Sequence, residues 1–197
     1  MTATQGTQGD RWFLDRLWFW LPVLPLVALD LASKELVFGF LDATYPGKPY
    51  AQHEIFGGWV RFSLTQWWNT GTIWGLGQGF NLPLIVLRIG AVAALVYFAL
   101  RCRPSQRLTL LVLGAILAGA LGNLYDNLTQ GRLAVYPVPG GEVGGVRDFL
   151  YFCFGGGPSP WCFPAFNVAD SCISVGAITL ALLILRAKPE TGGNAAS

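Results

Sequence analysis

Four stretches of this sequence are long and apolar enough to cross a lipid bilayer as α-helices. A helix needs roughly 20 mostly apolar residues to span the hydrocarbon core of a membrane. The stretches cover about residues 17–40, 82–100, 108–125 and 168–185. Only 12% of the residues are charged, whereas soluble domains carry about 25% charged residues. We therefore expect an all-α polytopic membrane protein built as a bundle of four transmembrane helices.

Arginine and lysine residues near the ends of these stretches predict the orientation in the membrane. Arg11 and Arg16 precede the first stretch, and Arg186 and Lys188 follow the fourth. The link between the second and third stretches contains Arg101, Arg103 and Arg107. With four spans, all of these positions lie on one side, and the positively charged side is the cytoplasmic one. We expect residues 1–197 to form one membrane domain with both termini in the cytoplasm.

Two longer segments, 41–81 and 126–167, then fall on the outer side. Apolar and polar residues alternate over 59–65, which predicts a short strand and a small extracytoplasmic β-sheet. Cys153 and Cys162 flank a Gly-Gly-Gly-Pro stretch in the second segment. An oxidising exterior permits a disulfide there, and two free thiols packed against aromatic rings are the alternative.

Ionisable and amide side chains gather near the predicted outer ends of the spans. An ionisable residue in a membrane span is costly and therefore indicates a functional site. The residues concerned are Asp30 with Lys34, Asn123 with Asp126, Asn167 with Asp170, and Asp148 in the outer segment. Another cation, Arg88, lies within the second stretch, where we expect snorkelling or an intrabundle hydrogen bond.

The reactive side chains in this sequence limit the catalytic mechanisms that are possible. The chain has one histidine, His53, and its four cysteines form no CxxC motif, so a zinc site or a nucleophile activated by histidine is not expected. A net charge of +2 gives no indication of nucleic-acid binding. Two carboxyl groups that share a proton remain. Such a pair hydrolyses a peptide bond with one group as base and the other as acid.

Asp148 and Asp170 are the two aspartates best suited to that chemistry. Asp170 begins the fourth span, where a helix N-terminus stabilises an anion, and Asn167 can cap that helix or orient the carboxylate. Asp148 lies within Val146-Arg147-Asp148-Phe149, in what we predict to be a loop. Two other aspartates have ready partners that suit structural roles better: Asp30 with Lys34, and Asp126 with Asn123. Composition and periodicity alone leave Asp126 as a rival to Asp148.

A transport protein is the alternative to an enzyme. Four helices with buried Asp and Lys could form a proton-coupled carrier or a small channel subunit. That function predicts polar residues on both sides of a pathway near the middle of the membrane. The clustering at one face favours chemistry at the membrane surface instead.

Five short motifs in order make the chain resemble the lipoprotein signal peptidases, also called signal peptidase II. Residues 30–34 resemble the family's DxxSK motif, 69–75 NxGxxFG, 122–126 GNxxD, 146–149 VxDF, and 166–170 FNxAD. The resemblance covers roughly residues 29–176.

The resemblance implies an aspartyl endopeptidase of the bacterial cytoplasmic membrane, with its active site at the outer face. Such enzymes remove the signal peptide from a prolipoprotein, cutting before a diacylglyceryl-modified cysteine. Asp148 and Asp170 map to the catalytic pair. The supporting and substrate-binding positions are Asn69, Gly71, Asn123, Asp126, Asn167, Asp30, Lys34 and Arg147. Membrane lipids and a globomycin-type inhibitor are the other expected partners, and no metal or cofactor is implied.

Trp74 stands where the NxGxxFG motif usually has Phe, and two further departures from the family pattern matter more. Asn127 stands where an arginine usually follows GNxxD, and Arg132 and Arg147 are the two candidates to replace it. The stretch between Asp126 and Asp148 is also longer than usual.

Overall fold

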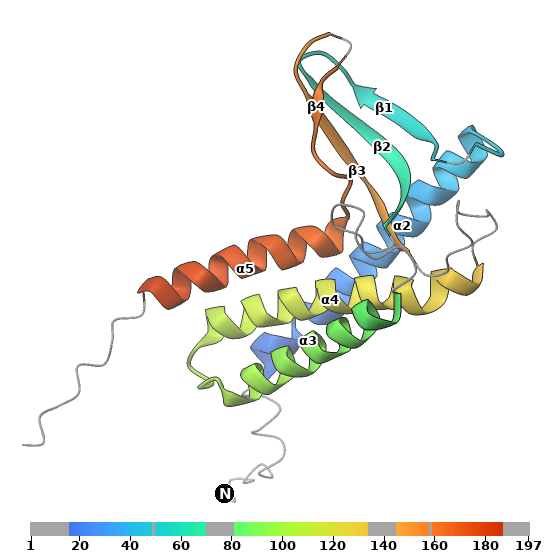
Figure 1. The fold of residues 1–197 in the computed structure, drawn as a ribbon. Helices are drawn as coiled ribbons and strands as arrows, with labels where there is room; N and C mark the ends of the chain where they lie inside the picture. The colour runs from blue at the N-terminus through green and yellow to red at the C-terminus, as the bar shows by residue number, and fades with distance from the viewer. Residues whose placement is uncertain (1–15, 49, 70–80, 134–144, 158, 187–197) are drawn as a thin grey trace, which may run out of the picture.

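The protein is mostly helical, with a small antiparallel sheet at one end of the helices (Figure 1). The computed structural model describes residues 16–48, 50–69, 81–133, 145–157 and 159–186. The long helices are α2 (Val23–Thr44), α3 (Asn81–Arg101), α4 (Arg107–Leu133) and α5 (Val168–Arg186). The strands are β1 (Gln52–Phe56), β2 (Val60–Asn69), β3 (Val146–Phe154) and β4 (Trp161–Cys162).

The helices agree with the predicted spans except at two boundaries. Residues 16–20 are helical, a turn follows at 21–22, and α2 then continues to Thr44. Proline lacks an N–H to continue the preceding helix, and Pro22 is the N-cap of α2. At its C-terminal end, α4 runs to Leu133, well past the predicted end at Tyr125. Hydropathy ends the span near Asp126, whereas the backbone helix continues through the polar residues that follow it.

Helix α4 is the central helix, and α2, α3 and α5 all pack against it. Glycines allow two of these helices to come close. A Cβ on Gly122 would collide with the carboxylate of Asp30 on α2, and a Cβ on Gly119 would collide with the carbonyl of Ala169 on α5. These two close approaches fall at the level of the charged residues. An apolar cluster fills the other end: Phe19, Val23, Ala99, Leu110, Leu113 and Leu117.

Two of the described helices are long and apolar enough to cross a membrane, over Arg107–Thr129 and Val168–Arg186. The second of these is hardly covered by protein. Its large apolar side chains are exposed at Val175, Ile178, Leu182, Ile184 and Leu185. A contiguous apolar surface of this kind is costly in water and suits contact with lipid.

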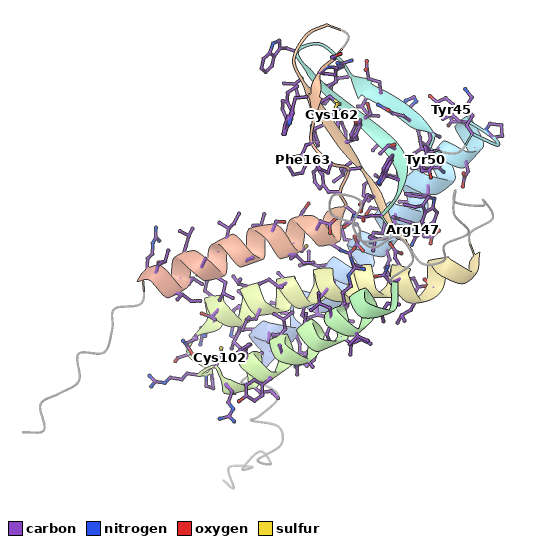
Figure 2. The ribbon with its side chains drawn as sticks, in the orientation of Figure 1. Tyr45, Tyr50, Cys102, Arg147, Cys162 and Phe163 are labelled. Carbon is purple, nitrogen blue, oxygen red and sulfur yellow. A yellow bond between two sulfur atoms is a disulfide. The ribbon has the colours of Figure 1, made fainter. Side chains whose placement is uncertain are left out.

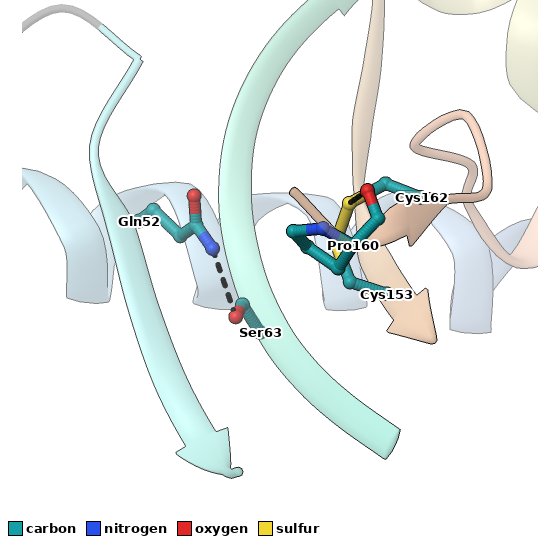
Figure 3. Close-up of a disulfide and its surroundings, with 5 residues drawn as sticks. All are labelled: Gln52, Ser63, Cys153, Pro160 and Cys162. Carbon is teal, nitrogen blue, oxygen red and sulfur yellow. Dashed lines mark hydrogen bonds between the residues drawn. A yellow bond between two sulfur atoms is a disulfide. The ribbon is translucent and has the colours of Figure 1, made fainter. Parts of the chain in front are cut away.

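The sheet has the order β1-β2-β3-β4, and every neighbouring pair is antiparallel. The strand predicted at 59–65 is confirmed as β2, which begins one residue later and runs on to Asn69. Its partner β3 lies far away in the sequence and continues the sheet to β4. Cys153 and Cys162 face one another across β3 and β4 and form a disulfide (Figure 3). The cysteines therefore form the disulfide, and the free-thiol alternative is excluded.

An irregularity in β2 ties the sheet to the helices. The register with β3 shifts between Leu64 and Trp67, and the side chain of Gln66 lies buried at that point. Its Nε2 donates to Oδ1 of Asp42 at 2.7 Å and to the carbonyl of Phe38 at 3.3 Å. Both acceptors belong to α2, so the base of the sheet is held against the C-terminal half of that helix.

Candidate active site

A buried polar cluster lies where the base of β3 meets the helices, around Arg147 (Figure 2). Its members come from α2, α4, β3 and the N-terminus of α5. Seven of them are at most 3% exposed: Asp30, Lys34, Asn123, Asp126, Arg147, Asp148 and Asn167. Buried charges of this kind are stable only when they are paired and hydrogen-bonded.

Lys34 connects the helices at the centre of the cluster. Its Nζ lies 2.7 Å from Oδ2 of Asp30 and 3.0 Å from Oδ2 of Asp126, and it donates to Oδ1 of Asn123 at 3.2 Å. The other oxygen of Asp30 accepts the backbone N–H of Ala169 at 2.9 Å. The predicted Asp30–Lys34 ion pair is therefore confirmed, and it also fixes the first turn of α5 against α2.

Arg147 holds Asp126 from the sheet side. Its Nε and Nη2 lie 3.1 and 2.9 Å from Oδ1 of Asp126, and its backbone N–H donates to Oδ2 at 3.1 Å. Nη1 bonds Oε1 of Glu35 at 2.6 Å. Asp126 thus pairs with Lys34 and Arg147, and the predicted pairing with Asn123 is wrong. Of the two candidates to replace the arginine absent at 127, Arg147 bonds this carboxylate.

Asn167 joins the two predicted catalytic aspartates. Its Oδ1 accepts the backbone N–H of Asp170 at 2.9 Å, and its own N–H donates to Oδ2 of Asp170 at 3.2 Å. This reciprocal pair caps the N-terminus of α5. Its Nδ2 lies 2.7 Å from Oδ1 of Asp148 and 3.2 Å from both Oδ1 of Asn123 and the carbonyl of Arg147. Both predicted roles of Asn167, helix cap and carboxylate positioning, are present together.

The remaining oxygens of the two aspartates are also held by amides. Asn69 Nδ2 donates to Oδ2 of Asp148 at 3.1 Å, and Asn123 Nδ2 donates to Oδ1 of Asp170 at 2.8 Å. Burial and the negative charge of Asp170 raise the pKa of Asp148 to about 8, although the bonds from Asn69 and Asn167 act in the opposite direction. Two carboxyl groups in one amide frame, with one holding its proton near neutral pH, can supply an acid and a base.

Sequence reasoning placed Asp148 in a loop, and the structure places it within β3, opposite Trp67 of β2. The strand was missed because most of its side chains are buried on both faces, so apolar and polar residues do not alternate. Gly71 lies outside the described residues. No group of three His, Cys, Asp or Glu side chains in the described segments is arranged to hold a metal ion.

Comparison with known proteins identifies the family of this chain. The sequence model of the family described as "Signal peptidase (SPase) II" matches residues 23–186. A lipoprotein signal peptidase of Pseudomonas syringae pv. tomato is 35% identical over 179 residues, covering 89% of this chain and 88% of the relative. One from Streptomyces coelicolor is 34% identical over 165 residues, covering 83% and 68%.

The fold is also similar to that of a solved bacterial membrane enzyme. That structure, determined by the in meso method at 2.3 Å resolution, superposes with a TM-score of 0.60 at 21% identity and covers the full length of both chains. A second, at 1.9 Å resolution, gives a TM-score of 0.59 at 22% identity over 95% of this chain and 100% of the other. At this level of identity the likeness concerns the fold. The family match over most of the sequence shows that the chain belongs to the signal peptidase II family.

Proposed function

We propose that Asp148 and Asp170 form the catalytic dyad with which this peptidase cuts a prolipoprotein before its diacylglyceryl-modified cysteine. Removal of signal peptides from prolipoproteins is the activity of the family. The dyad assignment rests on one observation: Asn167 bonds both carboxyl groups, and Asn69 and Asn123 bond their outer oxygens. A frame of this kind positions two carboxyl groups for a shared substrate.

The two carboxyl groups divide the reaction. Asp148, whose pKa is about 8, is the proton donor of the pair, and Asp170 is the proton acceptor. Asp170 accepts a proton from water as the water oxygen attacks the scissile carbonyl, and Asp148 donates its proton to the carbonyl oxygen. Collapse of the tetrahedral intermediate breaks the C–N bond. The amine leaves with the proton that Asp170 took up, and the carbonyl oxygen returns its proton to Asp148.

Two cavities next to the dyad fit the two chemically different parts of such a substrate. A groove of about 500 Å³ runs along α4 and α5 from Val168, beside the dyad, and apolar groups line almost all of it. It suits the acyl chains or the apolar signal helix. A second cavity of about 560 Å³ opens on the sheet and includes Asn69, Trp67 and Tyr151. It suits the polypeptide that follows the cysteine, and a globomycin-type peptide inhibitor would compete for the same region.

The proposed membrane placement has four spans, α2 to α5, with the dyad at the outer face and both termini in the cytoplasm of a bacterial inner-membrane protein. The arginine-rich link between α3 and α4 supports this, because it lies at the end of the helices opposite the sheet (Figure 1). Arg186 ends α5 on the same side as this link. Positive charge on that side predicts that it faces the cytoplasm.

Cleavage of a purified lipidated prolipoprotein tests the dyad. Asp148→Asn and Asp170→Asn keep the size of each side chain and remove its acid–base chemistry. We expect each to lower kcat by at least about 10³-fold, the scale on which removing a catalytic acid or base acts. Thr129→Val is the matched control, since the hydroxyl of this half-buried residue donates to the carbonyl of Tyr125 on its own helix, α4. Near wild-type cleavage by either aspartate variant would refute the assignment.

A further inference from the structure

Tyr50 has a backbone conformation that a bulky residue rarely adopts, and it lies beside the sheet (Figure 2). Its φ is 57°, and among the described residues it alone, glycines aside, has a positive φ. An aromatic residue in this left-handed region is strained, and such strain persists only where neighbouring contacts hold the backbone in place. Residues of this kind cluster at binding and catalytic sites. The conformation of Tyr50 therefore calls for a functional explanation.

Contacts with β2 hold Tyr50 in this conformation. The carbonyl of the next residue, Ala51, accepts the backbone N–H of Gln66 at 2.8 Å, and Ala51 itself is buried. Gln66 stands at the register shift of β2, where its side chain is bonded to α2. The ring of Tyr50 lies against that of Trp67, with centroids 5.5 Å apart and planes inclined by 48°. Both rings are therefore held at the irregularity in β2.

The Tyr50–Trp67 pair is left open toward a cavity. Tyr50 is 41% exposed and Trp67 is 50% exposed, whereas a ring pair kept for packing alone would be buried. Both residues line the cavity of about 560 Å³ that opens on the sheet. Aromatic rings bury a large apolar area when a partner packs on them, and they often dominate the energy of binding. The pair therefore offers a binding surface to a molecule that enters the cavity.

This surface lies next to the dyad. Trp67 is paired with Asp148 across β2 and β3, and Asn69, on the same strand as Trp67, donates to Oδ2 of Asp148 at 3.1 Å. Asn69 also lines the cavity. All the described residues that line it are uncharged. Binding there depends on ring contacts and neutral hydrogen bonds, and a polypeptide in the cavity would lead directly to Asp148.

We propose that the Tyr50–Trp67 pair is a substrate-binding subsite that holds the polypeptide on the C-terminal side of the lipidated cysteine. The two rings pack against the backbone and uncharged side chains of the first residues after the cysteine. They contact the substrate away from the reacting atoms, so they bind the ground state and the transition state equally. This inference rests on the proposed function, from which the substrate is taken.

Two lipidated substrates of different length test this subsite. One continues for several residues after the cysteine, and the other ends at the cysteine amide. Tyr50→Gly and Trp67→Leu should each raise KM for the long substrate by roughly 3- to 10-fold, the scale of one aromatic contact, with kcat nearly unchanged. KM for the short substrate should stay at its wild-type value. If the short substrate is cut too slowly to measure, its inhibition constant against the long one replaces KM.

Trp59→Leu is the matched control for Trp67→Leu. This tryptophan is also exposed, in the turn before β2, but it is not among the described residues that line the cavity. The control variant should keep the wild-type KM for both substrates.

Melting temperatures separate a binding role of Tyr50 from a structural one. Glycine adopts a positive φ without strain, and this relief offsets the lost ring contact. Tyr50→Gly should therefore melt no lower than the wild type while its KM for the long substrate rises. Asparagine also tolerates this conformation, so Tyr50→Asn repeats the test if the glycine variant does not fold.

Two results would overturn the proposal. An equal rise in KM for both substrates would show that the pair acts on the lipid, the signal peptide or the fold. An unchanged KM for the long substrate in both variants would show that the pair does not bind the polypeptide. Neither result bears on the dyad, which is tested separately by the loss of kcat in Asp148→Asn and Asp170→Asn.

Discussion

The side-chain amide of Asn167 lies 2.7 Å from Asp148, and this bond links the start of α5 to the middle of the sheet. The same residue caps α5 through its Oδ1, and its backbone N–H donates to the carboxyl group of Asp170. One residue therefore holds the helix N-terminus and both carboxyl groups. Helix capping and dyad geometry are coupled here.

Substitutions at Asn167 should separate these two roles. Asn167→Ser keeps a capping oxygen but loses the donor to Asp148, whereas Asn167→Ala loses both. We expect both variants to lose most of their activity, about 10²-fold or more for a misplaced catalytic group. Only the alanine variant should also lose the cap, which contributes about 1 kcal/mol. Cleavage rates and thermal melting measure the two effects. Full activity in Asn167→Ser would show that the amide does not position Asp148.

The stability of the protein should fall as pH rises because of Asp148. Its pKa is about 8 in the folded protein, compared with 3.8 for an aspartate without the surrounding structure. The folded state therefore binds more protons than the unfolded state between these two pH values. The stabilisation is complete below about pH 4 and is lost as pH rises through 8. Melting temperatures between pH 5 and 9, followed by tryptophan fluorescence, should therefore decline less in Asp148→Asn than in the wild type. Equal declines would contradict the raised pKa.

Lys34→Met should destabilise the protein strongly. The methionine fills similar space but leaves the buried carboxylates of Asp30 and Asp126 without their shared cation. Removing one partner of a buried ion pair costs about 3–5 kcal/mol. Glu35→Gln is the comparison, because Glu35 is 68% exposed and an exposed pair contributes about 1 kcal/mol or less. Similar melting temperatures for the two variants would show that the Lys34 pairs add little to stability.

Reduction should loosen the short strand β4. The Cys153–Cys162 bond closes a small loop and joins β4 to the strand that carries Asp148, so its loss should cost about 2–3 kcal/mol. A reductant should lower the melting temperature of the wild type and leave a Cys153→Ser, Cys162→Ser double variant unchanged. Cys102→Ser controls for free thiols, since Cys102 is unpaired and lies at the opposite end of the helices (Figure 2). A reductant effect that persists in the double variant would exclude the disulfide as its cause.

The sequence by itself determined the helices, one strand and the identity of the polar residues. Hydropathy is a local property, so the apolar runs marked α3 and α5 to within one residue of each end and missed the two polar turns that lengthen α4. Residue type and the order of the five motifs also predicted Asp148 and Asp170 as the catalytic pair, because few other side chains in this chain can carry out hydrolysis.

Only the tertiary structure determined which strands pair and which polar side chains bond one another. Strand β3 forms by pairing with β2 about eighty residues earlier, and no local pattern records that pairing. Lys34, Asp126 and Arg147 come from three different elements, so their mutual ion pairs depend on how α2, α4 and the sheet pack. Asp148 became a buried strand residue with a raised pKa for the same reason. Burial and long-range contacts set the chemistry of these groups, and they exist only after the chain has folded.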